Sequence, residues 1–277
     1  MPRAPVRVRR VPPRAPHEEP ADARPEPRAV STYLTDLDLE RLPRHVGIVM
    51  DGNGRWATQR GLPRTEGHAA GEAAMWDTVV GANEIGLGWL TMFAFSTENW
   101  NRPKAEVAYL MGFNRGLLRR RRDELHRMNV RVRWLGRRDW RVPRSVLKEM
   151  QISEELTRHN TGMTLTIAFN YGGRVEIADA VKKLLADHDA GRLKGEKLGP
   201  ESIARRLYHP DTPDPDLIIR TSGEERISNF LLWQAAYSEL YFTPVLWPDF
   251  DREHLYEAIR DFQKRTRRFG AIDEPRD

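Results

Sequence analysis

Short runs of β-branched and aromatic residues alternate along this chain with longer stretches of helical character. The short runs predict six strands, at residues 46–50, 89–95, 130–135, 163–169, 217–219 and 240–242. The longer stretches predict helices at about residues 68–85, 104–128, 143–159, 174–188, 201–207, 229–236 and 252–268, two of them opened by Pro103 and Pro143. Strands that alternate with helices indicate an α/β fold in which helices surround a central, mostly parallel six-stranded sheet.

The first thirty residues lack this alternation and hold eight prolines. Because proline fixes φ and removes an amide donor, we expect residues 1–30 to form a disordered tail, ahead of a single catalytic domain over residues 31–277. The tail also holds seven arginines against four acidic residues, so only two of the five net positive charges fall on the rest of the chain. That is too little charge to predict a nucleic-acid surface. The tail itself has either no role or a contact with anionic lipid headgroups.

The composition narrows the compartment and the class of protein. The chain has no cysteine, which excludes a disulfide framework and a cysteine-based zinc site and favours a reducing cytoplasm. Its longest apolar runs, such as residues 89–95, are far shorter than the ~20 residues that cross a bilayer, so we expect a soluble protein, at most peripheral to a membrane. A non-enzymatic nucleic-acid-binding protein is an alternative, but the arginines at 119–122 would point around most of a helix and form no single docking stripe.

Polar motifs follow four of the predicted strands. Residues 51–55 (DGNGR) come after the first strand, 96–99 (STEN) after the second, 170–173 (NYGG) after the fourth and 220–223 (RTSG) after the fifth. Open parallel sheets bind ligands beyond the carboxyl ends of their strands. We therefore expect these four segments to share one site.

The first motif suits a phosphate group. Its glycine and asparagine residues favour a turn whose amides can approach phosphate oxygens, and Arg55 adds a planar pair of donors. Asp51 should be ionised at neutral pH, and it would repel a phosphate charge ~4 Å away by ~4 kcal/mol at an effective dielectric constant of ~20. A bridging Mg²⁺ turns that repulsion into attraction. An ordinary turn between strand and helix explains the same residues without a ligand.

Other enzyme classes share parts of this pattern. Residues 52–57 fit G-x-G-x-x-A, the signature of a dinucleotide-binding α/β enzyme, but the next strand ends roughly forty residues further on, whereas that binding unit spans about thirty. The trans type of isoprenoid elongation uses DDxxD motifs on helices, and the nearest run, residues 211–216, contains prolines that prevent a helix. No G-x-x-x-x-G-K-[ST] motif occurs, which argues against a P-loop nucleotidase.

Three segments resemble the signatures of the cis-prenyltransferase family, which includes undecaprenyl diphosphate synthases: HVGIVMDGNGRW (45–56), FSTENWNRP (95–103) and DLIIRTSGEERISNFLLWQ (216–234). IAFNYGGR (167–174) and AYSELYFTPVLWPDF (236–250) keep the family's order, and the likeness runs from about residue 45 to 270. The resemblance implies an enzyme that condenses isopentenyl diphosphate with an allylic diphosphate, such as farnesyl or geranyl diphosphate, into a Z-polyprenyl diphosphate for a lipid carrier in cell-wall synthesis. It also implies Mg²⁺, a homodimer, a hydrophobic tunnel, delivery of the product to a membrane, and no nucleic acid.

The resemblance assigns roles around the allylic diphosphate. Asp51 matches the family's essential acid, which positions Mg²⁺ and assists departure of the diphosphate. Trp56 is expected beside the allylic chain, although core packing explains it as well, and His68 has helix capping as an alternative. The residues that match the cradle of this diphosphate are Gly52, Asn53, Gly54, Arg55, Arg64 and His68.

Other matches lie around the second substrate. Asn99 matches the proposed proton acceptor, and because an amide is a poor base we expect it to orient substrate or relay a proton. The residues that match the lining beside it are Ser96, Thr97, Glu98, Trp100 and Arg102. The residues that match the isopentenyl diphosphate pocket are Arg220, Arg226, Ile227 and Ser228, although Ser228 and Asn229 would also suit a helix cap.

The metal ligands and the tunnel follow from the same resemblance. Glu239 matches a carboxylate linked to Mg²⁺, although a surface position on a strand explains it too. Glu225 stands where some members have a histidine ligand, which leaves the ligand set around the second diphosphate open. Burial stabilises ~0.8 kcal/mol per methylene, so a growing isoprenoid needs an apolar tunnel, and residues 69–75 and 107–118 are candidates for its wall. Ala94 is small, which favours a medium or long product.

Overall fold

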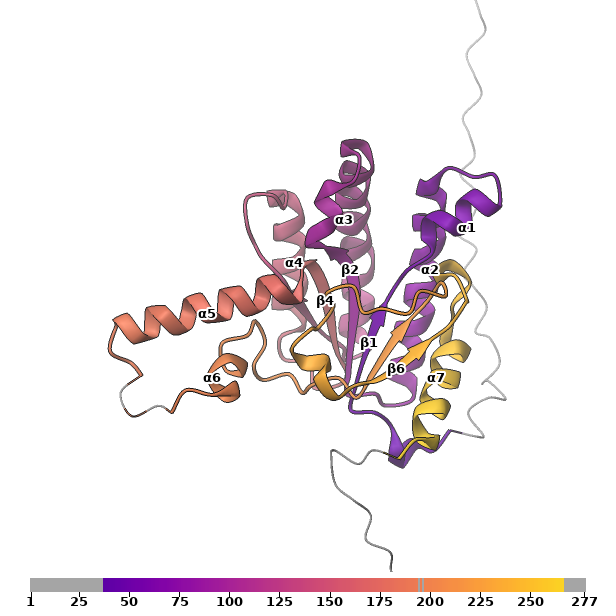
Figure 1. The fold of residues 1–277 in the computed structure, drawn as a ribbon. Coiled ribbons are helices and arrows are strands. Elements are labelled where there is room, and N and C mark those ends of the chain that lie inside the picture. The colour runs from indigo at the N-terminus through magenta and orange to yellow at the C-terminus, as the bar shows by residue number, and fades with distance from the viewer. Residues whose placement is uncertain (1–36, 194, 196, 267–277) are drawn as a thin grey trace, which may run out of the picture. The chain divides into compact units, whose positions relative to one another are not determined.

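The protein is built on a sheet of six strands in the order β3-β4-β2-β1-β5-β6, and every neighbouring pair is parallel (Figure 1). This computed structural model describes residues 37–193, 195 and 197–266. The strands are β1 (His45–Val49), β2 (Trp89–Ser96), β3 (Arg131–Leu135), β4 (Thr164–Tyr171), β5 (Leu217–Arg220) and β6 (Glu239–Phe242). The predicted α/β class, with its parallel sheet of six strands, is therefore confirmed.

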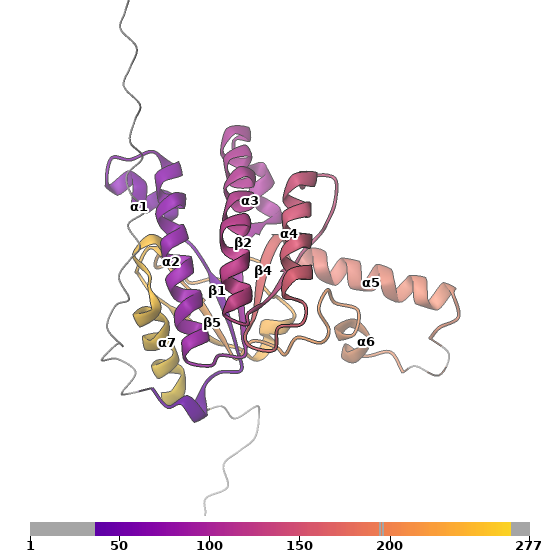
Figure 2. The same cartoon turned by 180° about the vertical axis from the view of Figure 1, so that it is seen from behind.

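Helices connect the strands, as parallel pairing requires. They are α1 (Asn53–Gln59), α2 (Arg64–Glu84), α3 (Lys104–Arg127), α4 (Arg144–Thr157), α5 (Gly173–Asp189), α6 (Pro200–Ala204) and α7 (Arg252–Lys264). Prolines with helix-compatible φ values stand directly before α2, α3 and α4, so the openings predicted at Pro103 and Pro143 are confirmed. Seen from behind, α2, α3 and α4 lie side by side over one face of the sheet (Figure 2), and α7 packs against α2 and β5.

The two faces of the sheet are covered differently. Val46 and Ile48 face the larger hydrophobic cluster, which lies under these helices, whereas Val49 faces a smaller cluster with Phe230 and Leu231. Phe230 and Leu231 come from an irregular segment after β5. The predicted helix at 229–236 is therefore wrong: Asn229 and Leu231 have φ values of 64° and 43°, which no right-handed helix contains.

Short 3-10 turns complete the connections. They are η2 (Leu39–Arg41), η3 (Thr97–Asn101), η4 (Gln234–Tyr237) and η5 (Trp247–Asp249). The helix α1 was not predicted, and it begins where Gly52 adopts a φ of 106°. The prediction of a disordered tail falls on residues 1–30, which lie outside the described residues. Within the described residues, no helix combines the length and the hydrophobicity that crossing a bilayer requires.

Two histidines, His45 and His209, hold a neutral imidazole that is largely buried. His45, on β1, is 2% exposed; its Nδ1 lies 2.7 Å from the carbonyl oxygen of Pro213 and its Nε2 lies 2.8 Å from Thr91 Oγ1. Burial lowers the pKa of His45 to about 4, against the smaller raising effect of the Pro213 carbonyl. Burial, together with the charge of Arg133, also lowers the pKa of His209 to about 4.

These histidines should make folding sensitive to acid. In the unfolded chain a histidine takes up its proton near pH 6.5, but in the folded protein these two stay neutral down to about pH 4. Their depressed pKa values therefore leave stability unaffected above pH 6.5 and lower it progressively between pH 6.5 and 4, by up to about 3 kcal/mol for His45. We expect urea unfolding at a series of pH values to show a flatter profile for His45→Gln than for the wild type. Parallel profiles would contradict this assignment.

Candidate functional site

A cavity of about 860 Å³ opens at the carboxyl edge of the sheet, where the segments after β1, β2 and β5 meet α2 and α3. All four polar motifs were predicted to share one site, and three of them contribute to the wall of this cavity. The fourth, residues 170–173, supports the site from behind: Asn170 Oδ1 accepts a hydrogen bond of 2.7 Å from Trp100 Nε1. Residues of the cavity wall that come from the motifs are Asp51, Gly52, Asn53, Gly54, Arg55, Ser96, Glu98, Asn99 and Arg220, and Ser228 and Asn229 join them from further along the segment after β5.

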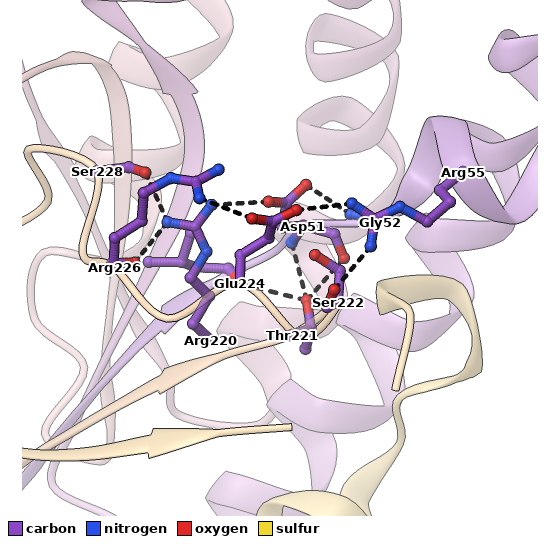
Figure 3. A network of polar contacts seen from close by, with 10 residues as sticks. Asp51, Gly52, Arg55, Arg220, Thr221, Ser222, Glu224, Arg226 and Ser228 are labelled. Carbon is purple, nitrogen blue, oxygen red and sulfur yellow. Dashed lines mark hydrogen bonds and ion pairs between the residues drawn. The ribbon is translucent and has the colours of Figure 1, made fainter. Parts of the chain in front are cut away.

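Asp51 stands at the mouth of this cavity (Figure 3). Thr221 holds its backbone, since Thr221 Oγ1 accepts from Asp51 N at 2.9 Å and donates to Asp51 O at 2.7 Å. Its carboxylate accepts from Gly52 N at 2.7 Å through Oδ1 and from Arg220 Nη2 at 2.8 Å through Oδ2. The side chain is still 40% exposed. The carboxylate is thus fixed in direction while one side of it stays open to a ligand.

Arg220 joins the carboxylate to the segment after β5. Its side chain is only 4% exposed, and besides Asp51 it donates through Nη1 to the carbonyl oxygen of Arg226 and to Ser228 Oγ (Figure 3). Its Nε is buried and finds no hydrogen-bond partner among the described residues. A guanidinium group presents donors in one plane, so a single side chain orients an acid, a carbonyl and a hydroxyl together.

A second ion-pair cluster lies beside Asp51. Arg55 donates to the carbonyl oxygen of Ser222 and to Glu224, each at 2.7 Å, and Arg226 donates to the other carboxylate oxygen of Glu224 at 2.7 Å. The hydrogen bonds from Arg55 and then Arg226 hold the pKa of Glu224 below its ordinary value. Both arginines are well exposed, so an incoming anion can compete with Glu224 for them.

Two arginines and a histidine gather on the other side of the cavity, around Glu106 of α3. Glu106 Oε1 lies 2.8 Å from Arg102 Nη1, 3.7 Å from Arg64 Nη2 and 3.8 Å from His68 Nε2. Burial, and after it the charge of Arg102, lowers the pKa of His68, so its imidazole is neutral at pH 7. Gly54 leaves the space for Arg64, because a Cβ there would stand 2.6 Å from the guanidinium carbon. Sequence reasoning missed Glu106, whose only signal is its spacing of four residues from Arg102, which lies just before α3.

The loop after β2 positions Asn99 and Glu98. Asn99 Oδ1 accepts from Ser96 N at 2.9 Å, which caps η3. Glu98 accepts from Thr97 Oγ1 and from Asn229 Nδ2. Burial raises the pKa of Glu98, but hydrogen bonds, chiefly from its own amide and from Asn229, outweigh this and hold that pKa below its ordinary value. Because the amide oxygen of Asn99 already accepts a hydrogen bond from Ser96 N, the structure favours an orienting role for Asn99 over that of a base.

Some predicted residues do not reach the cavity wall. Thr97, Arg226 and Ile227 do not line it, and Trp100 packs edge-on against Phe95, 4.9 Å between ring centres. Trp56 does not face the cavity either: its Nε1 donates to Asp249 at 2.7 Å, and the guanidinium carbon of Arg60 lies 4.1 Å from its ring centre.

Glu239 lies at the other end of the sheet from Asp51. In the register of the strands, Val49 pairs with Arg220, whereas Leu217 pairs with Glu239, so Glu239 stands at the amino edge. Its carboxylate accepts from Arg265 at 2.8 Å. The structure therefore does not bring Glu239 and Asp51 of one chain together, and no group of three potential metal-ligating side chains occurs among the described residues.

The cavity continues inward as an apolar channel. Met75, Ala94, Asn114 and Leu117 line both the large cavity and a smaller one of about 30 Å³ behind it. The inner wall includes Val79, Leu118, Leu125, Met150, Leu165 and Ile167. The segments expected to form the tunnel, 69–75 and 107–118, contribute to the wall of the large cavity. The residues are Gly71, Glu72, Met75, Leu110, Phe113, Asn114 and Leu117.

Comparison with known proteins agrees with this geometry. Residues 49–270 match the family model described as putative undecaprenyl diphosphate synthase. A trans,polycis-polyprenyl diphosphate synthase ((2Z,6E)-farnesyl diphosphate specific) of Thermobifida fusca is 55% identical over 93% of this chain and 90% of its own length. The decaprenyl diphosphate synthase of Mycobacterium tuberculosis is 55% identical over 84% of this chain and 78% of its own length.

A solved structure is similar over most of the chain. It is the lavandulyl diphosphate synthase of Lavandula x intermedia in complex with dimethylallyl diphosphate, which superposes with a TM-score of 0.80 at 35% identity. The match covers 83% of this chain and 99% of that protein.

Proposed function

Because this chain belongs to the undecaprenyl diphosphate synthase family, we propose that it is a prenyltransferase that condenses isopentenyl diphosphate with an allylic diphosphate, such as farnesyl diphosphate, to give a Z-polyprenyl diphosphate. The observation that carries the proposal is the Asp51–Arg220 ion pair, which joins the segment after β1 to the end of β5 in a cavity that is polar at this end and continues into an apolar channel. A cavity with charge at its mouth and hydrocarbon in its depth suits a molecule with a diphosphate head and an isoprenoid tail. Membership of the family and identities of 55% to polyprenyl diphosphate synthases support this function.

Two groups of hydrogen-bond donors, each with at least one arginine, support two diphosphate sites. Arg64 and His68, with the amides of residues 52–55, face one side of the cavity and suit the allylic diphosphate. Arg220 and Ser228 face the other and suit isopentenyl diphosphate, with Arg226 within reach once it leaves Glu224. Guanidinium groups form paired hydrogen bonds to phosphate oxygens, which fixes the direction of each substrate.

The residues present fit a divalent cation at Asp51. Mg²⁺ commonly keeps several waters and takes one or two protein carboxylates together with substrate phosphates, so a single accessible carboxylate is enough. Asp51 offers that carboxylate, 40% exposed and held in direction by Gly52 and Arg220. When bound, Mg²⁺ would neutralise charge on the departing diphosphate.

The protein's own groups would carry the rest of the reaction. The apolar channel encloses the growing chain and excludes water from the carbon centre that loses its diphosphate. Asn99 and Glu98 stand on the wall between the two diphosphate sites, where a proton must leave the isopentenyl unit. Since Asn99 Oδ1 accepts from Ser96 N, we propose that Asn99 orients the substrate and that the proton passes to water or to diphosphate.

The assay is direct. Purified protein with Mg²⁺, farnesyl diphosphate and labelled isopentenyl diphosphate should make extended Z-prenyl products, and chelation by EDTA should stop their formation until Mg²⁺ is restored. Product chromatography measures both yield and chain length. Failure to extend farnesyl, geranyl and dimethylallyl diphosphate alike would refute the function, and salt-sensitive binding of RNA or DNA in its place would support the nucleic-acid alternative.

The family also supports a homodimer at work in the cytoplasm that passes its product to a membrane. A single catalytic domain over residues 31–277 remains the prediction for the organisation of the chain.

Ala94 should influence the length of the product. It lines both the large cavity and the channel behind it, so a larger side chain there would narrow the neck. We expect Ala94→Leu to shift the product distribution towards fewer isoprene units, as measured by chromatography. Ala94→Gly is the matched control, because it changes the same position without adding volume, and it should give products at least as long as the wild type. Equal distributions for both variants would contradict the tunnel assignment.

A further inference from the structure

Asn229 joins three segments at the rim of the cavity. Its Nδ2 donates to Glu98 Oε1 at 2.9 Å, and its Oδ1 accepts from Arg174 N at 2.8 Å. Its carbonyl oxygen accepts from Gly173 N at 2.8 Å. The segment after β5 is thereby tied both to the loop after β2 and to the first amides of α5, which follows β4.

The backbone at this junction is left-handed. Asn229 has a φ of 64° and Ser228 a φ of 47°. Asparagine tolerates this region better than most residues with a side chain. The described residues directly after Asn229 form no α-helix, so Asn229 does not cap its own segment. It accepts instead from the first amides of α5, about 55 residues earlier in the chain.

The junction has no spare volume. A Cβ on Gly172 would stand 2.6 Å from Thr97 Oγ1 and 2.7 Å from Asn229 Nδ2. The side chain of Asn229 is therefore packed between the backbone of residue 172 and the carboxylate of Glu98. A shift of Asn229 would displace Ser228, its neighbour, whose hydroxyl accepts from Arg220.

We propose that Asn229 is a positioning residue for prenyl transfer, which holds Ser228 and Arg220 in place for the diphosphate of the second substrate. The same side chain holds Glu98, next to Asn99, so it sets the distance between the second diphosphate site and the wall on which Asn99 stands. This inference rests on the proposed function. It predicts an effect on isopentenyl diphosphate rather than on the allylic substrate, whose cradle lies on α2 and the segment after β1.

The decisive variant is Asn229→Asp. This substitution keeps the shape of the side chain and its tolerance of a positive φ, and one carboxylate oxygen can still accept from Arg174 N. The amide nitrogen that donates to Glu98 is replaced by a second carboxylate oxygen, which cannot donate. We expect the KM for isopentenyl diphosphate to rise by about tenfold or more, the size of one lost hydrogen bond to a charged group, while the KM for farnesyl diphosphate changes by less than about threefold. Asn229→Gly adopts the positive φ without strain and removes the side chain, and it should also raise the KM for isopentenyl diphosphate.

A second substitution tests the contact itself. Glu98→Gln offers an amide donor to the carboxylate of the Asn229→Asp variant, so the double variant re-forms the hydrogen bond with donor and acceptor exchanged. The factor by which Asn229→Asp raises the KM for isopentenyl diphosphate should fall to less than about threefold in the Glu98→Gln background. An equal factor in both backgrounds, or equal rises in the KM of both substrates, would overturn the proposal.

Calorimetry separates this inference from the proposed function. Titration with inorganic pyrophosphate in the presence of saturating farnesyl diphosphate, which fills the first site and is not extended without isopentenyl diphosphate, measures the second site without turnover, and the same coupling between the two substitutions should appear in its Kd. Wild-type protein that transfers no prenyl group would refute the function, whereas the absence of coupling in both KM and Kd would refute the role of Asn229. Thermal unfolding of each variant identifies any that fail to fold, and Asn229→Gly then decides the case.

Discussion

Asp51→Ala should lower kcat for prenyl transfer by about a thousandfold or more, the largest effect of any single substitution in the site. Within the cavity mouth Asp51 is the carboxylate that combines a fixed direction with open access, because Gly52 and Arg220 hold it while 40% of the side chain stays exposed. Its loss removes the one group placed to bring a cation to the departing diphosphate. Asp51→Asn should cost nearly as much, since an amide keeps the shape but not the charge.

The fold should survive both changes. The loss of Asp51 removes the carboxylate partner of the buried Arg220 and lowers stability, but Arg220 retains its bonds to Arg226 and Ser228, so we expect the variants to stay folded. Steady-state kinetics and thermal unfolding of the same preparations separate activity from stability. Asp211→Asn is the matched control, because Asp211 also accepts from an arginine, Arg133, at 2.8 Å but lies outside the cavity wall. Unchanged turnover in Asp51→Ala would show that the cation is held elsewhere.

The strands were predictable because each is a short buried run between polar turns. All five residues of β1 are buried, and its β-branched residues alternate between two apolar clusters. The helix α1 was not predictable in the same way. Its seven residues include one buried apolar side chain, Ala57, and its start depends on the positive φ of Gly52 and on contacts of Arg55 with the segment after β5.

The helix predicted at 229–236 failed for the opposite reason. Its apolar residues suit a helix locally, but Phe230 and Leu231 are buried against the sheet, and Asn229 is held in a left-handed conformation by bonds to α5. Tertiary contacts override local propensity here, and such contacts cannot be read from a segment alone.

The residues of the site likewise divide into those that the sequence pattern predicts and those that depend on tertiary contacts. Residues that follow a strand, such as Asp51 and Arg220, were predicted because all carboxyl ends of a parallel sheet lie at one edge. Glu106, on α3, carries no motif, and Glu224 lies within a signature segment that assigned it no role, so only the packed structure reveals the contacts of these two acids. Glu239 could have been placed from the sequence, since it precedes its strand rather than follows it, and so lies at the edge opposite Asp51.

Arg220→Lys should lower kcat/KM for isopentenyl diphosphate by about a hundredfold or more, although it preserves the charge. The guanidinium of Arg220 donates at once to Asp51, to the carbonyl of Arg226 and to Ser228 Oγ from a side chain that is 4% exposed. The ammonium group of a lysine, at the end of a flexible stem, cannot donate at once to the acceptors that Nη1 and Nη2 of Arg220 reach. Asp51, the carbonyl of Arg226 and Ser228 would no longer be held together, and the buried ammonium group would be only partly paired.

The pattern of the loss distinguishes Arg220 from a merely structural ion pair. We expect the KM for isopentenyl diphosphate to rise and kcat to fall, because Arg220 touches both the second diphosphate pocket and the acid that serves the first. Arg133→Lys is the matched control, since Arg133 pairs with Asp211 and is 19% exposed, yet contributes nothing to the cavity wall. If both lysine variants kept wild-type kinetics, the ion pair of Asp51 and Arg220 would be a device of the fold, and the second diphosphate would have to bind to Arg226 and its neighbours alone.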